Sequence, residues 1–220
     1  MTHAVKMGGR GVLNALVIGG EDLRTALVEP QPGESSGLAG AVHAQHPSVE
    51  VDVRHIDVAP FPAAAALEGA LRNGKGNGGD VDAVIVSLMP HQACQPEELS
   101  SGLAALITQV RASSGAHLIL ANACTYGAAT EPDPGTAVSA RLRLRRLNLT
   151  LMELSRDLDA SILDVDRLIT EMGARQACPY PFELSPAAAA AIAGEAARVI
   201  GEYGFFEDRP LVAQVPREAG

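Results

Sequence analysis

The sequence predicts an α/β fold built on a parallel sheet. Short apolar runs rich in β-branched residues recur along the chain, and amphipathic helical patterns separate them. Strands that alternate with helices at this spacing are joined by right-handed crossovers, which place helices on both faces of the sheet. We therefore expect a three-layer α/β/α sandwich with a doubly wound parallel sheet of about five strands.

The strand predictions follow from the pattern within each run. Three runs are short and almost wholly apolar, as in strands that helices cover on both faces: Asn14–Gly19, Asp82–Leu88 and His117–Ala121. Val49–Asp57 alternates apolar and polar residues, which predicts an edge strand with one wetter face. Ser161–Val165 is a short fifth candidate.

The helix predictions follow from apolar residues spaced three and four positions apart. This spacing predicts helices over Glu97–Arg111 and Arg141–Leu158. The last helix is expected to begin after Ser185 as its N-cap, with Pro186 at the first helical position. Two weaker helical patterns are Leu38–Gln45 and Ala63–Leu71.

Length and composition favour one large domain. The chain has 220 residues, of which 47% are hydrophobic and only 3% aromatic, so the predicted core is large and aliphatic. We expect a single domain over residues 13–203, a flexible N-terminal tail over residues 1–12 and a C-terminal tail over residues 204–220. The glycine-rich segment Asn73–Gly79 is predicted to be a surface loop, because it precedes a strand, whereas a phosphate-binding loop follows one.

The net charge and the absence of apolar targeting segments argue against nucleic acid and membranes as partners. The formal net charge of −9 argues against general binding to nucleic acid or to an anionic membrane. No run approaches the roughly 18 apolar residues of a membrane-spanning helix, and the first residues lack an export signal. The arginine run predicts only a solvated helix face, and its members are Arg141, Arg143, Arg145 and Arg146.

The cysteine count suits a reducing compartment. An odd number of cysteines in a chain of this size indicates thiols in a cytosol rather than a disulfide framework. We therefore expect a cytoplasmic protein that takes a small-molecule substrate or ligand and needs no cofactor. The sequence leaves the oligomeric state open.

The predicted topology also says where to look for chemistry. In a doubly wound sheet, ligands bind outside the carboxyl ends of the strands. Three segments follow predicted strands, and a fourth precedes the last predicted helix. These four segments are Gly20–Leu23, Ser87–His91, Asn122–Tyr126 and Cys178–Pro186.

The order of these four segments resembles the SGNH, or GDSL, hydrolase family. In that family the first strand ends in Gly-Asp-Ser-Leu, the third runs into Gly-x-Asn-Asp, and the last helix follows an Asp-x-x-His-Leu-Ser-Pro-like turn. The resemblance covers roughly residues 13–202. Asn148, on the penultimate predicted helix, also resembles a frequent family pattern. The resemblance implies a flavodoxin-like sandwich of the SGNH-hydrolase kind.

The catalytic positions of the family carry other residues here. Gly20 and Leu23 match the first block, but Asp22 stands where the nucleophilic serine would be. In the last block Glu183 occupies the histidine position and Tyr180 the aspartate position.

The third block departs as well. Pro90 and His91 fall near its Asn-Asp, so the asparagine donor to an oxyanion is absent. A serine hydrolase needs an activated hydroxyl and donors for the oxyanion. The resemblance therefore implies the fold without the ordinary Ser–His mechanism.

Two carboxylates could replace that mechanism. Asp22 and Glu183 are expected to face one cleft together with His91. Neighbouring carboxyls in a partly dry pocket push their pKa values apart, so that one holds a proton while the other is ionised. We expect a small-molecule enzyme that acts on an acyl or carbonyl-containing substrate by cyclisation, isomerisation or elimination. Substrate contacts are expected from Glu21, Met89, Cys94, Asn122, Cys124, Tyr126 and Tyr180.

Three alternatives stay open. A non-catalytic relative could bind a ligand or partner in the same cleft, with solvated acids near a helix N-terminus. A hydrolase could use a relocated nucleophile, Cys94 or Ser87. The cysteines all fall at the predicted functional edge, where a thiolate could be activated by His91 or the thiols could bind a metal. Because no Cys-x-x-Cys pair is present, we predict no metal site.

Overall fold

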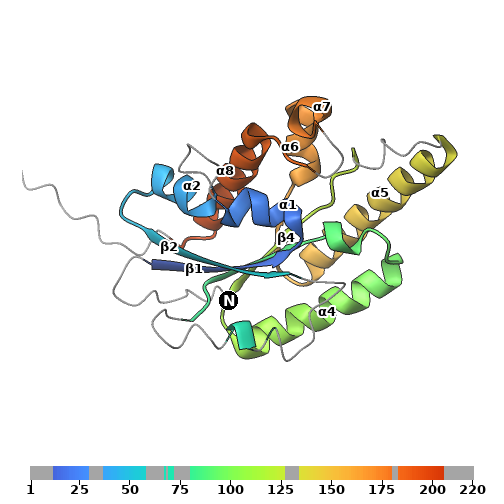
Figure 1. The fold of residues 1–220 in the computed structure, drawn as a ribbon. Helices are drawn as coiled ribbons and strands as arrows, with labels where there is room; N and C mark the ends of the chain where they lie inside the picture. Colours follow the sequence, from blue (N-terminus) through green and yellow to red (C-terminus); the bar gives the residue numbers. More distant parts are fainter. Residues whose placement is uncertain are drawn as a thin grey trace, which may run out of the picture.

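The computed structural model describes residues 12–29, 37–57, 67, 69–71, 80–126, 134–179 and 183–205. Within these residues five parallel strands form one sheet in the order β2-β1-β3-β4-β5 (Figure 1). The strands are β1 (Val12–Gly19), β2 (Glu50–Asp57), β3 (Ala83–Ser87), β4 (His117–Ala121) and β5 (Ser161–Leu163). This order is that of the flavodoxin-like doubly wound sheet, so the predicted fold class is confirmed.

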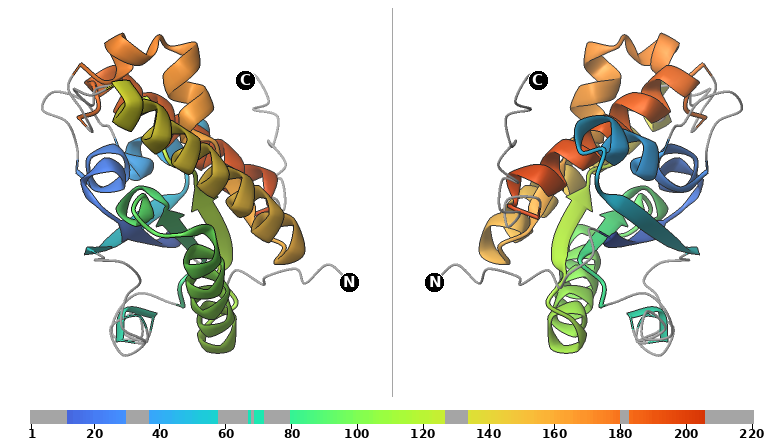
Figure 2. Two further views of the ribbon diagram at one scale, coloured as in Figure 1. Left: turned by 90° about the vertical axis from the view of Figure 1, so that its right-hand side faces the viewer. Right: turned by 90° about the vertical axis from the view of Figure 1, so that its left-hand side faces the viewer.

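Helices cover both faces of this sheet (Figures 1 and 2). One face is covered by α1 (Glu21–Leu23), η1 (Arg24–Val28), α2 (Leu38–Gln45), α6 (Val165–Glu171), α7 (Ala174–Ala177) and α8 (Pro186–Glu202). The other face is covered by α4 (Pro96–Ser113) and α5 (Pro134–Asp157). A single 3-10 turn, η3 (Met89–His91), follows β3.

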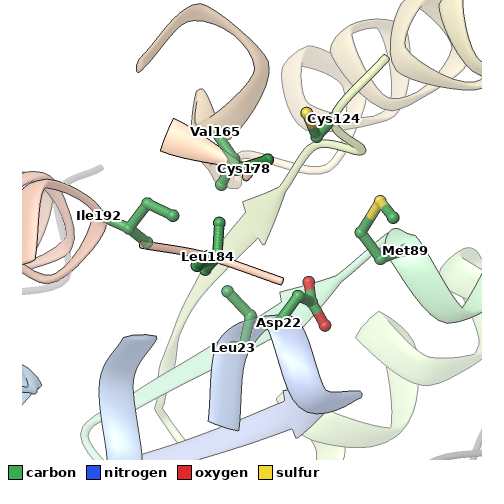
Figure 3. Close-up of a pocket in the computed structure, with 8 residues that line it drawn as sticks. All are labelled: Asp22, Leu23, Met89, Cys124, Val165, Cys178, Leu184 and Ile192. Carbon is green, nitrogen blue, oxygen red and sulfur yellow. The ribbon is translucent and has the colours of Figure 1, made fainter. Parts of the chain in front are cut away.

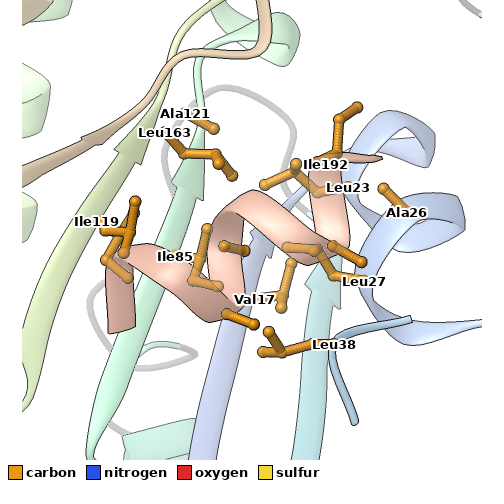
Figure 4. Packing of buried hydrophobic residues seen from close by; sticks show 14 of the residues in the cluster. Val17, Leu23, Ala26, Leu27, Leu38, Ile85, Ile119, Ala121, Leu163 and Ile192 are labelled. Carbon is orange, nitrogen blue, oxygen red and sulfur yellow. The ribbon is translucent and has the colours of Figure 1, made fainter. Parts of the chain in front are cut away.

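Alternating side chains along each strand form a separate core on each face. In β1, Leu13 and Val17 pack with α8 and η1, whereas Leu16 and Ile18 pack toward α4. Figure 4 shows residues of the first of these clusters, with α8 lying over the strands. Burying an aliphatic side chain of this size contributes about 1.5–3 kcal/mol relative to exposure, so both faces stabilise the sheet.

The ends of the elements follow local chemistry. The predicted N-cap of the last helix is confirmed, because Ala188 N donates to Ser185 Oγ at 3.2 Å. Gln95 and Glu98 form a capping box at the start of α4. β5 ends two residues before its predicted limit, because Asp164 accepts a hydrogen bond from Arg167 N at 3.1 Å and begins α6.

Other differences concern segments that apolar periodicity does not detect. α5 begins seven residues earlier than predicted, at Pro134 rather than Arg141, through a stretch of small and polar residues in which Ser139 Oγ donates to Gly135 O at 3.0 Å. α6 and α7 have seven and four residues, which is too short for a clear apolar stripe.

Several sequence predictions fall largely or wholly outside the described residues. The glycine-rich loop Asn73–Gly79 lies outside them, as do most of the two predicted tails. Of the predicted helix Ala63–Leu71, the described residues 67 and 69–71 are helical. Among the helices that the structure describes, none has both the length and the apolar character needed to cross a membrane.

Candidate functional site

A cavity opens at the carboxyl ends of the central strands, where the doubly wound topology predicts a site. Its walls come from α1, η3, the segment after β4, α6, the residue that follows α7, the segment before α8 and α8 itself (Figure 3). The cavity is small, with a volume of about 30 Å³, and it is partly open to solvent. Most of the lining is apolar. Its polar members are the carboxyl of Asp22 and the thiols of Cys124 and Cys178.

The cavity lies at the point where the strand order reverses. From β1 the chain passes to β2 on one side and then returns across β1 to β3 on the other. Connections that leave in opposite directions open a crevice between them. Asp22 follows β1 and Met89 follows β3, so both walls of this crevice contribute to the lining.

Asp22 is held by a side chain from the neighbouring strand. Ser87 Oγ donates a hydrogen bond to Asp22 Oδ2 at 2.6 Å and accepts one from Met89 N at 3.0 Å. Ser87 is only 1% exposed, so its hydroxyl is a buried support for the carboxyl. Burial raises the pKa of Asp22, and the hydrogen bond from Ser87 opposes that rise. Asp22 can therefore keep a proton at a higher pH than an exposed aspartic acid.

Gly19 allows the close contact between these two strands. A Cβ atom at position 19 would lie 2.9 Å from the Cβ atom of Ser87, which is closer than real side chains approach. Only glycine fits there without moving β1 away from β3. The glycine that ends β1 thus helps to place Ser87 beside Asp22.

The segment after β4 is fixed by side-chain amides. Asn122 Nδ2 donates to Asp164 Oδ1 at 2.7 Å, and Asn122 Oδ1 accepts from Asp166 N at 2.9 Å. Asn148 of α5 exchanges two hydrogen bonds of 2.9 Å with the backbone of Ala123. These contacts hold Cys124 at the cavity wall, and both ends of the Asn122 amide are used in joining β4 to α6.

Three of the residues predicted for the site line the cavity together, namely Asp22, Met89 and Cys124. Glu183 does not line it: its side chain is exposed, although the next residue, Leu184, contributes to the wall. Asn122, as described above, is likewise not among the lining residues.

His91 and Cys94 also lie away from the cavity lining. His91 is 2% exposed, and burial lowers the pKa of its imidazole to about 4. Burial, together with the nearby Glu98 carboxylate, raises the pKa of the Cys94 thiol. Neither residue is therefore placed as a base or a thiolate within the cavity.

The other predicted contacts have different surroundings. Glu21 is exposed and forms an ion pair of 2.7 Å with Arg24. Tyr126 is partly buried against the core cluster that contains α8. Tyr180 lies outside the described residues.

The structure adds two apolar wall residues that the sequence did not indicate, Val165 and Ile192. No short motif marks them, because they come from separate helices that only the fold brings together. Ser87, a candidate nucleophile from the sequence, is instead the hydrogen-bond partner of Asp22. In the part of the chain that the structure describes, no group of three or more His, Cys, Asp or Glu residues could hold a metal ion.

Comparison with known proteins identifies the fold. A variant of Axe2, an acetyl-xylooligosaccharide esterase from Geobacillus stearothermophilus, is 15% identical with a TM-score of 0.61, over 88% of this chain and 95% of that one. A lipolytic G-D-S-L family protein from Veillonella parvula is 11% identical with a TM-score of 0.59, over 85% and 97%. A candidate SGNH hydrolase from Slackia heliotrinireducens is 18% identical with a TM-score of 0.59, over 86% and 100%.

These similarities establish the architecture. The chain has the SGNH-hydrolase-like fold over most of its length, as its sequence resemblance predicted. No family model matches the sequence. No curated protein matches it either.

Proposed function

We propose that the protein is a small-molecule enzyme that acts on an acyl or carbonyl-containing substrate, with Asp22 as its general acid and base. One observation carries this proposal: the Asp22 carboxyl faces a mostly apolar cavity, is oriented by Ser87 at 2.6 Å and has a raised pKa. General acid–base catalysis is most effective when the pKa of the group approaches the working pH. A raised carboxyl pKa moves Asp22 in that direction.

The cavity suits one end of an acyl compound better than a highly charged molecule. Leu23, Met89 and Ile192 offer apolar contacts to a hydrocarbon chain. Within the described part of the chain, Asp22 is the single carboxyl in the lining. In sites of this kind, a few polar groups among apolar walls fix the orientation of the ligand. In its protonated form Asp22 would donate to a carbonyl or leaving oxygen, and in its ionised form it would remove a proton from carbon or water.

The proposed chemistry differs from acyl-enzyme hydrolysis. Asp22 occupies the position that resembles the family's nucleophilic serine, and Ser87 is buried with its proton directed to Asp22. A cyclisation, isomerisation or elimination needs proton transfer without a serine nucleophile. We propose that Asp22 alone exchanges protons in the cavity, because the Glu183 side chain is exposed and does not line it.

A second candidate function is ligand binding without catalysis. The observation that favours it is the lining itself: among the described residues that form it there is one carboxyl but no histidine, lysine or arginine. A relocated nucleophile is less well supported. Cys94 lies outside the cavity lining and has a raised thiol pKa, and Ser87 is almost fully buried.

A product screen can separate these functions. The full-length protein and Asp22→Asn would be incubated with a panel of acyl esters, thioesters, lactones and keto acids, and the products followed by mass spectrometry. We expect conversion by the unmodified protein, its loss in Asp22→Asn, and no labelling by a fluorophosphonate. Binding in thermal-shift assays without any product would support the ligand-binding function instead. Stoichiometric fluorophosphonate labelling of a serine would establish a relocated hydrolase.

A further inference from the structure

The cavity wall carries two thiols that the proposed proton transfer does not use. Cys124 lies after β4 and is partly exposed, while Cys178 follows α7 and is only 6% exposed. The two residues are 54 positions apart in the sequence, yet both line the cavity and both are present as thiols. Cys124 lies close enough to Cys178 to raise the pKa of the Cys178 thiol. The fold therefore brings two cysteines that are distant in the sequence together at the wall of one cavity.

The two thiols are not equivalent. The hydrogen bond with Cys124, burial and the charge of a Cys124 thiolate all raise the pKa of Cys178. Cys178 therefore holds its proton more strongly than an exposed thiol does, and Cys124 is the more exposed member of the pair. Because the thiolate is the attacking species in thiol–disulfide exchange, the more exposed Cys124 is the first to react.

We propose that Cys124 and Cys178 are a redox-active pair, which a low-molecular-weight disulfide oxidises to an intramolecular disulfide in the cavity wall. The Cys124 thiolate attacks one sulfur of the small disulfide, forming a mixed disulfide and releasing one thiolate. Cys178 then loses its proton and attacks the Cys124 sulfur, which releases the second thiolate. The two cysteines lose two electrons and two protons, and the small disulfide is reduced to two thiols.

The link would join two separate parts of the fold. It connects the segment after β4, which Asn148 and Asp166 hold in place, with the turn between α7 and the segment before α8. A bond that closes a loop of this length restricts the unfolded chain, so oxidation should raise the melting temperature by about 5–10 °C. Oxidation would also alter the wall of the candidate site.

The test uses the full-length protein in glutathione buffers of increasing oxidised fraction. Remaining thiols are counted by maleimide labelling and intact mass, and disulfide-linked peptides are identified after digestion at low pH. We expect two of the three thiols to be lost together, a peptide pair that joins Cys124 to Cys178, and a higher melting temperature. Persistence of all three thiols in the most oxidising buffer would overturn the proposal, as would links between chains.

Single substitutions check the order of the steps. Cys94→Ser is the matched control, because Cys94 does not line the cavity, and it should leave the oxidation unchanged. Cys178→Ser should stop the reaction at a stable glutathione adduct on Cys124. Cys124→Ser should leave Cys178 unmodified, because that thiol is buried and keeps its proton. Rapid modification of Cys178 in a Cys124→Ser protein of normal melting temperature would show that Cys124 is not the attacking thiol.

Discussion

The two ends of the sheet carry similar buried polar groups in different surroundings. At the carboxyl end, Asp22 has a raised pKa and faces a cavity. At the amino end, Asp82 also has a pKa raised by burial, but its carboxylate accepts from Asn14 N at 2.8 Å and from Asn14 Nδ2 at 3.4 Å. The same electrostatic effect therefore accompanies an accessible carboxyl at one end and a structural hydrogen bond at the other.

A serine–histidine pair at the amino end of the sheet also has a shifted pKa without being a candidate site. At the amino end, His117 Nε2 lies 2.9 Å from Ser161 Oγ, a spacing that would suit a nucleophile and its base. The Tyr203 ring is stacked on the His117 imidazole, however, and burial lowers the pKa of that imidazole to about 4. A shifted pKa alone shows that a group is buried. A candidate site also requires space for a ligand beside that group.

The largest expected effect separates the two aspartates. Asp22→Asn should reduce turnover at least about a hundredfold, the usual scale for removing a general acid or base. Asp82→Asn keeps an acceptor for Asn14 N, so turnover should stay within about twofold. Steady-state kinetics of both variants on a substrate from the product screen measures this contrast. Equal losses in the two variants would mean that Asp22 acts only through stability.

Asp22→Asn should not lower the stability of the protein, although it lowers turnover. Because its folded-state pKa is raised, the protonated form stabilises the protein below the unfolded-state pKa. That stabilisation is lost as the pH rises through the folded-state value. Asn carries no charge, so Asp22→Asn should have an equal or higher free energy of unfolding at neutral pH. Urea denaturation at pH 7 tests this, and a clear loss of stability would contradict the stated cause of the shift.

A smaller effect is expected for the serines. Ser87→Ala removes a hydrogen bond that lowers the pKa of Asp22, so the acidic limb of the pH–rate profile should move to higher pH. Turnover should fall about tenfold, corresponding to a hydrogen bond worth about 1.4 kcal/mol. Ser161→Ala, the matched change at the amino end, should leave both the rate and the profile unchanged. An unshifted profile in Ser87→Ala would assign Ser87 a purely structural role.

Acid should destabilise the protein through the two buried histidines. The folded-state pKa of both His91 and His117 is lowered to about 4, from an ordinary value of 6.5, so the unfolded chain binds more protons between these values. The unfolding free energy should therefore fall as the pH decreases from 6.5 toward 4, by at most about 1.4 kcal/mol per pH unit for each histidine. Urea denaturation across this range measures the slope, and His117→Asn should reduce it. An unchanged slope in that variant would show that His117 is not the cause.

The sequence predicted the fold more fully than the site, for a physical reason. Strand runs such as His117–Ala121 are local patterns and appear in the structure with the same bounds. The pairing of Asp22 with Ser87 depends on β1 lying beside β3 and on Gly19 allowing close contact, which no local pattern records. Likewise, the sequence predicted that all three cysteines lie at the functional edge of the sheet, but of these only Cys124 and Cys178 line the cavity.

The smallest expected effect is at Glu183, and it decides whether one carboxylate or two carry the reaction. The sequence resemblance paired Glu183 with Asp22 across a cleft, but the Glu183 side chain is exposed and only its neighbour Leu184 lines the cavity. An exposed carboxylate that does not line the cavity is not placed to exchange protons with a substrate held there. Glu183→Gln should therefore change turnover by less than about threefold, whereas Asp22→Asn should reduce it about a hundredfold. Glu21→Gln, another exposed acid near the cavity, is the matched control for loss of a surface charge. If Glu183→Gln matches the loss in Asp22→Asn while Glu21→Gln does not, Glu183 turns inward during turnover and both carboxylates share the proton transfers.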